Sequence, residues 1–76
     1  MTESTLDARG LLCPMPVIKT QNAIRKLQAG DVLTVVCTDP GVLHDIPAWC
    51  RINGHKVLGQ QQENREIEIR IEVCGS

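Results

Sequence analysis

Hydrophobic and polar residues alternate most regularly in the last part of the chain, from Glu66 to Cys74. Isoleucine or valine stands at positions 67, 69, 71 and 73, and charged residues stand between them up to Glu72. This period of two predicts a strand that is buried on one face and charged on the other. The weaker segment His55–Gln61 and the polar turn Glu63–Arg65 precede it, so the two segments together predict a β-hairpin.

Two further strands are predicted in the first half of the chain. Thr5–Ala8 is a short candidate with Leu6 and Ala8 on one face. Asp31–Thr38 is mostly apolar and β-branched, which is typical of a strand buried on most of both sides. Residues 1–4 are expected to be frayed, as chain ends often are.

Apolar residues at helical spacing predict a first helix that begins at Pro14 or Pro16 and runs to about Ala29. A proline fits the first turn, because its missing N–H would have no partner inside the helix there. One face of this helix is a stripe made of Val17, Thr20, Ile24 and Leu27. Gly30 is a natural residue to end this helix.

A second helix is predicted between about Val42 and Asn53, ended by Gly54. Pro47 lies within this segment and would interrupt a helix interior. We therefore expect the helix proper to start near Asp45, with Asp45 as the N-cap and Pro47 in the first turn.

The order of elements is therefore βαβαββ, which predicts right-handed crossovers and at least one parallel pair of strands. The expected fold is an α/β (α+β) two-layer sandwich, a mixed four-stranded sheet with two helices on one face. The charged side of the last strand indicates that the other face meets water. At 76 residues the chain is expected to be a single domain, 1–76.

Composition excludes several classes of function. The formal net charge is −1 with no block of like charge, and Trp49 is the only aromatic residue, so direct nucleic-acid binding is not expected. No apolar run reaches the ~20 residues of a membrane span. The N-terminal segment lacks a basic stretch followed by an apolar one, so we expect a cytoplasmic protein. A monomer is the default expectation.

The four cysteines need individual interpretations, because cytosolic thiols stay reduced. Cys37 and Cys50 are expected in the core, as small apolar residues. The position of Cys74 in the alternating pattern places it with the outward residues, so it is expected to be exposed, where it could oxidise or act as a second functional thiol. Cysteines and histidines are scattered singly, whereas structural zinc needs paired ligands at short spacing, so no metal or other cofactor is predicted.

Cys13 lies just ahead of a helix that starts with proline. The N-terminus of a helix carries roughly half a positive charge, which stabilises a thiolate and lowers the pKa of the thiol. Pro14 and Pro16 would shape the helix start, and Arg9 could add positive potential. Cys13 is therefore the candidate reactive residue, while the alternative interpretation is a buried and inert small side chain.

The surroundings of Cys13 in the sequence limit its chemistry. Nothing in the spacing places His44 or His55 beside it as a base, and position 16 is proline where a Cys-x-x-Cys exchange centre has its second cysteine. A lone activated thiol suits carrying a sulfur atom as a persulfide. The alternative from another class is a regulatory or interaction module that uses no covalent chemistry.

Three basic residues of the first helix, Lys19, Arg25 and Lys26, form a second candidate site. They could be an electropositive rim that helps a partner dock beside the Cys13 loop. The alternative interpretation is an ordinary solvated helix face.

Several blocks of the sequence match a known family in order. They are Leu6-Asp7-x-Arg9-Gly10-Leu11-x-Cys13-Pro14-x-Pro16-Val17, Gly30-Asp31-x-Leu33, Thr38-Asp39-Pro40-Gly41, Asp45-Ile46-Pro47-Ala48-Trp49-Cys50-Arg51 and Gly54-His55. From about Leu6 to Val73 the chain resembles the TusA (SirA-like) sulfur-carrier family. The resemblance implies the same βαβαββ sandwich. It departs at Val42-Leu43-His44, where the family often has a small polar residue.

The resemblance also implies a function. Members accept sulfane sulfur on the cysteine of Cys-Pro-x-Pro from a cysteine desulfurase or a rhodanese, and pass it to an acceptor protein. Destinations include 2-thiouridine formation in tRNA, molybdenum-cofactor sulfuration and dissimilatory sulfur oxidation. Cys13 matches the acceptor position, so a persulfide relay is expected rather than a multiple-turnover enzyme.

Overall fold

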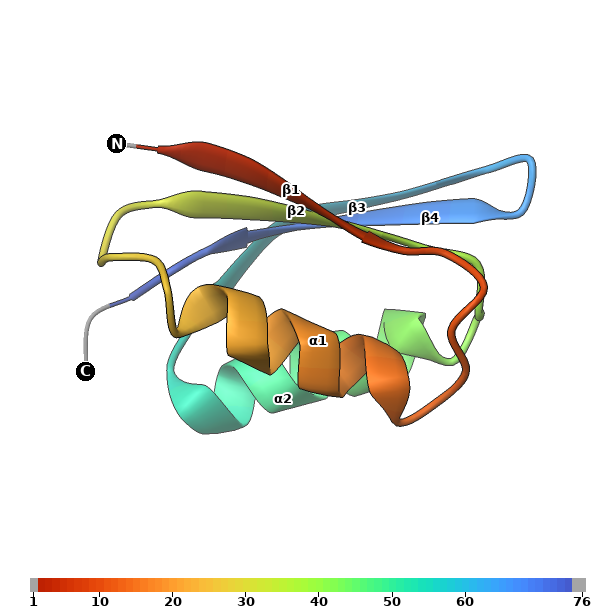
Figure 1. Cartoon of the computed structure of the whole chain (residues 1–76), viewed down its shortest axis with the longest axis horizontal. Helices are drawn as coiled ribbons and strands as arrows, with labels where there is room; N and C mark the ends of the chain where they lie inside the picture. The colour runs from red at the N-terminus through yellow and green to blue at the C-terminus, as the bar shows by residue number, and fades with distance from the viewer. Residues whose placement is uncertain (1, 75–76) are drawn as a thin grey trace.

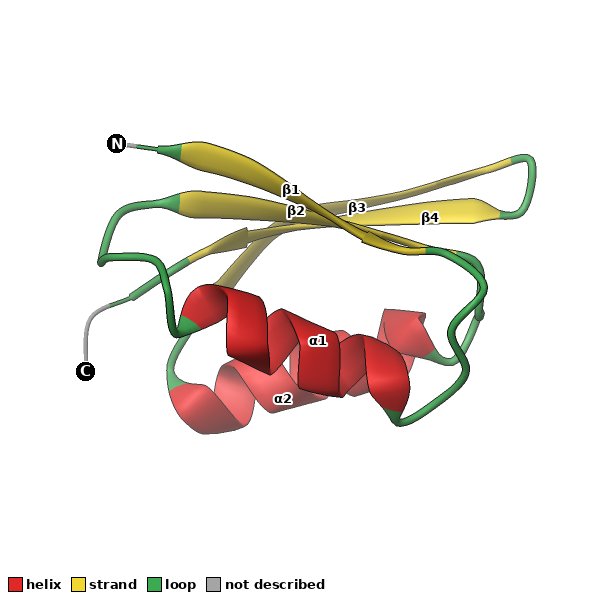
Figure 2. Cartoon of the chain, viewed as in Figure 1, coloured by secondary structure: helices red, strands yellow, loops and turns green. Residues whose placement is uncertain are grey.

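The structure, a computed structural model, describes residues 2–74. Six elements follow one another in the predicted βαβαββ order (Figures 1 and 2). They are β1 (Glu3–Ala8), α1 (Met15–Ile24), β2 (Val32–Cys37), α2 (Val42–Asn53), β3 (Lys56–Glu63) and β4 (Glu66–Glu72).

The four strands form one mixed sheet in the order β1-β2-β4-β3. β1 and β2 are parallel, whereas β4 is antiparallel to both of its neighbours, β2 and β3. Figure 1 shows both helices on the same side of this sheet, with the other side uncovered. The predicted two-layer sandwich is therefore confirmed.

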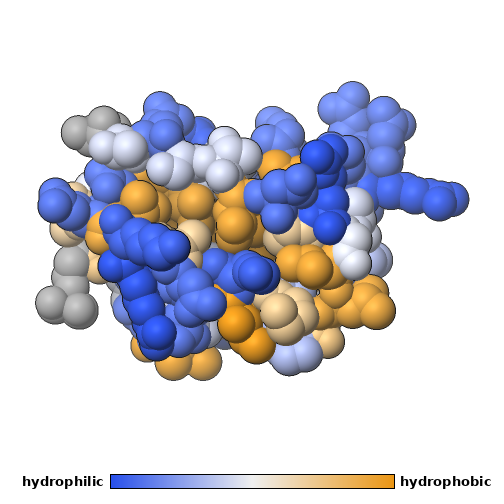
Figure 3. Space-filling view, viewed as in Figure 1, coloured by the Kyte–Doolittle hydropathy of each residue, from blue (hydrophilic) through white to orange (hydrophobic). Residues whose placement is uncertain are grey.

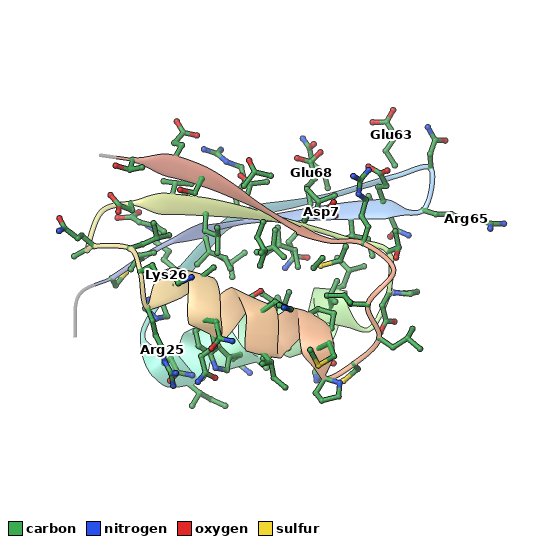
Figure 4. The ribbon with its side chains drawn as sticks, viewed as in Figure 1. Asp7, Arg25, Lys26, Glu63, Arg65 and Glu68 are labelled. Atoms are coloured by element: carbon green, nitrogen blue, oxygen red, sulfur yellow. The ribbon has the colours of Figure 1, made fainter. Side chains whose placement is uncertain are left out.

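The core lies between the sheet and the helices and follows the alternation seen in the sequence. In the β2–β4 pair, Leu33 faces Ile71 and Val35 faces Ile69, and all four are almost fully buried. Burying each such side chain contributes about 1.5–3 kcal/mol. The intervening side chains of β4 are exposed, and Figure 4 shows Glu68 on the side of the sheet away from the helices.

The first strand begins two residues earlier than predicted, so the expectation that residues 1–4 are frayed is wrong for Glu3 and Ser4. Both are paired in parallel with β2, and Thr2 extends this pairing through a bond from Val32 N–H to its carbonyl oxygen, at 2.8 Å. The carboxylate of Asp31 also accepts the N–H of Thr2, at 3.0 Å. Residue 1 lies outside the described residues.

The first helix is shorter than predicted, because it ends at Ile24 instead of about Ala29. Beyond Ile24 the chain continues in tighter turns, in which Lys26 N–H and Leu27 N–H donate to carbonyl oxygens three residues earlier. The Asp31 carboxylate then accepts the N–H of Gln28 at 2.9 Å, which satisfies a donor that a longer helix would have used.

The second helix starts at Val42 with Gly41 as its N-cap, so the expected N-cap at Asp45 is wrong. The turn Asp39-Pro40-Gly41 explains the earlier start, because Asp39 Oδ1 accepts the N–H of Gly41 at 3.1 Å. Pro47 consequently lies inside the helix, where it has no N–H for the carbonyl four residues earlier. Asp45 instead occupies the first turn of α2.

The C-terminal strand also differs from the prediction at its end. β4 stops at Glu72, and Cys74 is half-buried where exposure was expected. The reason is that Cys74 lies beyond the alternating strand: its N–H donates to His55 Nδ1 at 3.2 Å, and its thiol lies 3.6 Å from the carbonyl oxygen of Glu72.

Candidate functional site

The loop between β1 and α1 carries Cys13 and is held in place by several hydrogen bonds. Gly10 has a φ of 78°, a left-handed conformation that glycine adopts without strain, and its N–H donates to Thr38 Oγ1 at 2.8 Å. Further along the loop, Met15 N–H donates to the carbonyl oxygen of Leu12 at 2.8 Å. The loop therefore presents Cys13 from a defined backbone conformation.

Two carboxylates, one in the β2–α2 turn and one in the first turn of α2, contact Cys13. Asp39 Oδ2 accepts the N–H of Cys13 at 3.2 Å, and Asp45 Oδ2 accepts a hydrogen bond from the Cys13 thiol at 3.3 Å. The side chain of Cys13 remains exposed to solvent. The site therefore combines the β1–α1 loop, the β2–α2 turn and the first turn of α2.

Both prolines of the motif lie at the start of α1. Pro14 is the N-cap and Pro16 lies within the first two helical positions, where Pro16 is buried and Pro14 is exposed. The Pro14 carbonyl oxygen already accepts the N–H of Ile18, at 3.1 Å. Cys13 is therefore one residue ahead of the N-cap, beside the N-terminus of α1.

The pKa of the Cys13 thiol is raised above its ordinary value, which corrects the expectation of an acidic thiol. The main cause is the hydrogen bond to Asp45; partial desolvation and the negative charges of Asp45 and Asp39 act in the same direction. These are full negative charges, whereas the helix N-terminus supplies roughly half a positive charge. The nearby carboxylates therefore oppose the stabilisation that the helix N-terminus offers a thiolate.

Arg9 is not among the groups that shift the pKa of the Cys13 thiol. Its guanidinium bonds Asp7 at 3.0 Å and Glu66 at 3.3 Å, and these two carboxylates raise its pKa. Asp7 and Glu66 belong to β1 and β4, so the guanidinium is bound to carboxylates of the sheet. For Arg9 to support Cys13 electrostatically, its guanidinium would have to leave these carboxylates and approach the sulfur.

Comparison with known proteins decides the family. A family model described as sulfurtransferase TusA matches residues 4–73. The sulfur carrier protein TusA of Pseudomonas entomophila is 51% identical over 61 residues, which are 80% of this chain and 76% of that protein. YrkI of Bacillus subtilis is 38% identical over 71 residues, 93% of this chain and 95% of that protein.

The chain belongs to the TusA family. The crystal structure of a SirA-like protein from Desulfitobacterium hafniense agrees, with a TM-score of 0.83 and 28% identity over 95% of this chain and 99% of that one. The resemblance noted in the sequence is therefore confirmed, and so is the fold that it implied.

In this TusA-family fold two of the three basic residues, Arg25 and Lys26, lie away from Cys13. Lys19, Arg25 and Lys26 are all exposed. Figure 4 shows Arg25 and Lys26 at the C-terminal end of α1, whereas Cys13 precedes its N-terminal end. A helix of 10 residues spans about 15 Å, so these two cations lie at the far end of the helix from the thiol.

Exposed apolar side chains lie closer to the thiol in the chain. Leu12, in the β1–α1 loop just before Cys13, is 73% exposed, and Met15 and Ile18, in the first turns of α1 just after it, are 39% and 42% exposed. Figure 3 shows hydrophobic surface at the lower right, over the end of the molecule where the β1–α1 loop enters α1. We call Leu12, Met15 and Ile18 the apolar rim; it lies next to Cys13 along the chain and offers surface that a partner could cover.

The other cysteines have different environments. Cys37 and Cys50 are fully buried as predicted, and burial raises the pKa of each thiol to about 11. Among the side chains of residues 2–74, no three His, Cys, Asp or Glu residues are grouped so that they could hold a metal ion. In the same part of the chain no helix has the length and apolar character needed to cross a bilayer.

Sequence reasoning missed Asp39 and Asp45 as members of the site, because it treated them as turn and cap residues. A signal was available, since Asp39 follows the end of β2 and Cys13 follows the end of β1. Parallel neighbouring strands end at the same edge of a sheet, so the loops that follow them come close together.

Proposed function

We propose that this chain is a sulfur carrier that holds sulfane sulfur as a persulfide on Cys13. The observation that carries the proposal is the position of Cys13, the exposed cysteine among residues 2–74, on a fastened loop at the start of α1. Membership of the TusA family supports the same assignment, since a relative in that family is named a sulfur carrier protein. The whole chain would act as one carrier domain in the cytoplasm, as a monomer.

The proposed loading step is an exchange of sulfur between two thiol groups. The Cys13 sulfur attacks the outer sulfur of a donor persulfide, a new S–S bond forms on Cys13, and the donor's S–S bond breaks. The proton of the Cys13 thiol passes to the departing donor sulfur, which leaves as a thiol. Sulfane sulfur moves from one cysteine to another with no net oxidation or reduction.

The partners proposed from the resemblance are a cysteine desulfurase or a rhodanese as donor, and an acceptor protein. The acceptor would belong to tRNA 2-thiouridine formation, molybdenum-cofactor sulfuration or sulfur oxidation. The apolar rim gives such partners a surface to cover next to the thiol. A docking role for Lys19, Arg25 and Lys26 would need a partner that extends along the whole of α1.

Intact-protein mass spectrometry tests the proposal directly. The protein is incubated with a cysteine desulfurase and cysteine, or with a rhodanese and thiosulfate, beside the variants Cys13→Ser and Cys74→Ser. We expect the unaltered protein and Cys74→Ser to gain the mass of one sulfur atom, which a reducing thiol removes, and Cys13→Ser to gain nothing. Equal gain in Cys13→Ser, or no gain in any protein, would favour the interaction-module alternative or another thiol.

A further inference from the structure

The groups that contact Cys13 act on its charge as well as on its position. Asp45 Oδ2 lies 3.3 Å from the sulfur, and Asp39 Oδ2 lies 3.2 Å from the backbone nitrogen of the same residue. Asp45 is half-buried in the first turn of α2, so the helix holds its carboxylate in place. The nearby cation in the Cys13 loop, Arg9, is already bonded to two other carboxylates.

The hydrogen bond between Cys13 and Asp45 exists only while the sulfur carries a proton. In a persulfide, Cys13 Sγ is bonded to Cβ and to the outer sulfur, so it has no hydrogen to donate. The Asp45 carboxylate then faces lone pairs and the negative charge of an ionised outer sulfur. Like charges at close range disfavour the ionised form. Asp45 therefore interacts favourably with the empty carrier and unfavourably with the loaded one.

We propose that Asp45 is a positioning residue that favours the thiol form of Cys13 over its persulfide form, so that the carrier gives up its sulfur readily. The part that concerns cargo rests on the sulfur-carrier function proposed above. The part that concerns the protonation of the thiol stands without it.

The unloading step balances as an exchange. The acceptor's sulfur attacks the outer sulfur of the Cys13 persulfide, an S–S bond forms on the acceptor, and the S–S bond on Cys13 breaks. The proton of the acceptor thiol ends on Cys13 Sγ, which then donates a hydrogen bond to Asp45 again. The bond regained with Asp45 belongs to the product side alone, so it favours release.

The first test measures the protonation of Cys13 by its rate of alkylation with iodoacetamide across pH. Only the thiolate reacts, and the tryptic peptide of residues 10–19 contains Cys13 as its single cysteine, so mass spectrometry follows this thiol alone. In Asp45→Asn we expect the profile to move to lower pH, with alkylation at neutral pH faster by about threefold or more, since one pKa unit is tenfold in thiolate.

Two further variants serve as controls for this measurement. Glu68→Gln removes the same charge from the open face of the sheet, so it should leave the profile where it is in the unaltered protein (Figure 4). Asp45→Glu keeps a carboxylate in the first turn of α2, so it should return the profile toward that of the unaltered protein. Thermal melting confirms that each variant is folded. An unchanged profile in Asp45→Asn would overturn the proposal.

The second test measures how sulfur distributes between the carrier and glutathione. Protein loaded with rhodanese and thiosulfate is freed of the donor and mixed with graded glutathione, and intact mass gives the loaded fraction at equilibrium. Asp45→Asn should need about threefold or more glutathione for the same unloading, whereas Glu68→Gln should match the unaltered protein. Equal distributions would overturn the cargo part. If no protein takes up sulfur, the carrier function itself fails, while the alkylation profile still decides the role of Asp45.

Discussion

At the scale of single residues, the chemistry of this site follows from which charge lies closest to the sulfur. The start of α1 offers Cys13 a partial positive charge, whereas Asp45 presents a full negative charge at 3.3 Å. The sequence identified Cys13 through its place before two prolines, a local feature. It could not identify the contact with Asp45, which lies 32 positions away and depends on the packing of α2 beside the β1–α1 loop.

The apolar rim leads to a prediction about Leu12. Replacing it with serine removes the most exposed member of the rim without touching the hydrogen bonds of Cys13. We expect Leu12→Ser to lower the rate of sulfur loading from a desulfurase by about fivefold, as truncation of an interface anchor does. Alkylation of Cys13 by iodoacetamide should stay the same.

A matched control for Leu12 is Leu58, which is 39% exposed on β3. Leu58→Ser removes an exposed leucine from another element, so loading should proceed at the rate of the unaltered protein. Equal slowing by both variants would mean that the rim has no particular role in docking.

At the scale of elements, the boundaries of the helices depend on side chains that compete for backbone donors. α2 starts at Val42 because Asp39 satisfies the N–H of Gly41, and α1 ends at Ile24 while Asp31 satisfies that of Gln28. Apolar spacing predicted the existence of both helices, since the stripe that packs on the sheet is visible in the sequence. It could not predict their ends, which depend on local turns such as those that Asp31 and Asp39 stabilise.

The end of α2 gives a prediction about backbone conformation. Gly54 has a φ of 80°, which an L side chain adopts only with strain, and a Cβ there would meet nothing within 4 Å. We expect Gly54→Ala to lower the free energy of unfolding by about 1–2 kcal/mol, measured by urea denaturation.

Gly59 on β3 is the matched control for this substitution. A Cβ at Gly59 also has open space, and its φ lies outside the left-handed region. Gly59→Ala should therefore change the free energy of unfolding by less than about 0.5 kcal/mol, as surface substitutions do. A loss at Gly59 as large as that at Gly54 would contradict the argument from φ.

At the scale of the whole molecule, the two faces of the sheet differ: the helices cover one face, where apolar side chains pack, and the other face is open and charged. The covered face holds the buried isoleucines of β4, while the open face carries acidic residues such as Glu68 (Figure 4). Alternation in the sequence predicted this division. The spatial order β1-β2-β4-β3 was not predicted, because a period of two says which face is buried and nothing about which strands are neighbours.

Asp31 links the start of β1 to the turn after α1, and this link predicts a pH dependence of stability. Its carboxylate accepts the N–H of Gln28 at 2.9 Å and of Thr2 at 3.0 Å, and these bonds lower its pKa. Because the folded protein binds this proton more weakly than the unfolded chain, the contribution is complete above the unfolded pKa of about 3.9 and is lost as pH falls through the lower folded value.

Asp31→Asn should therefore be less stable than the unaltered protein at pH 7, with a gap that narrows as the pH falls below about 4. Thermal melting from pH 7 to pH 2.5 measures that gap, and Glu68→Gln, which removes an equal charge from the open face, reports the effect of net charge alone. If the difference in melting temperature between Asp31→Asn and the unaltered protein stays constant from pH 7 to pH 2.5, Asp31 acts by its size or local geometry and its charge contributes nothing. A narrowing gap specific to Asp31 would assign part of the acid sensitivity of the fold to one carboxylate that links the start of β1 to the turn before β2.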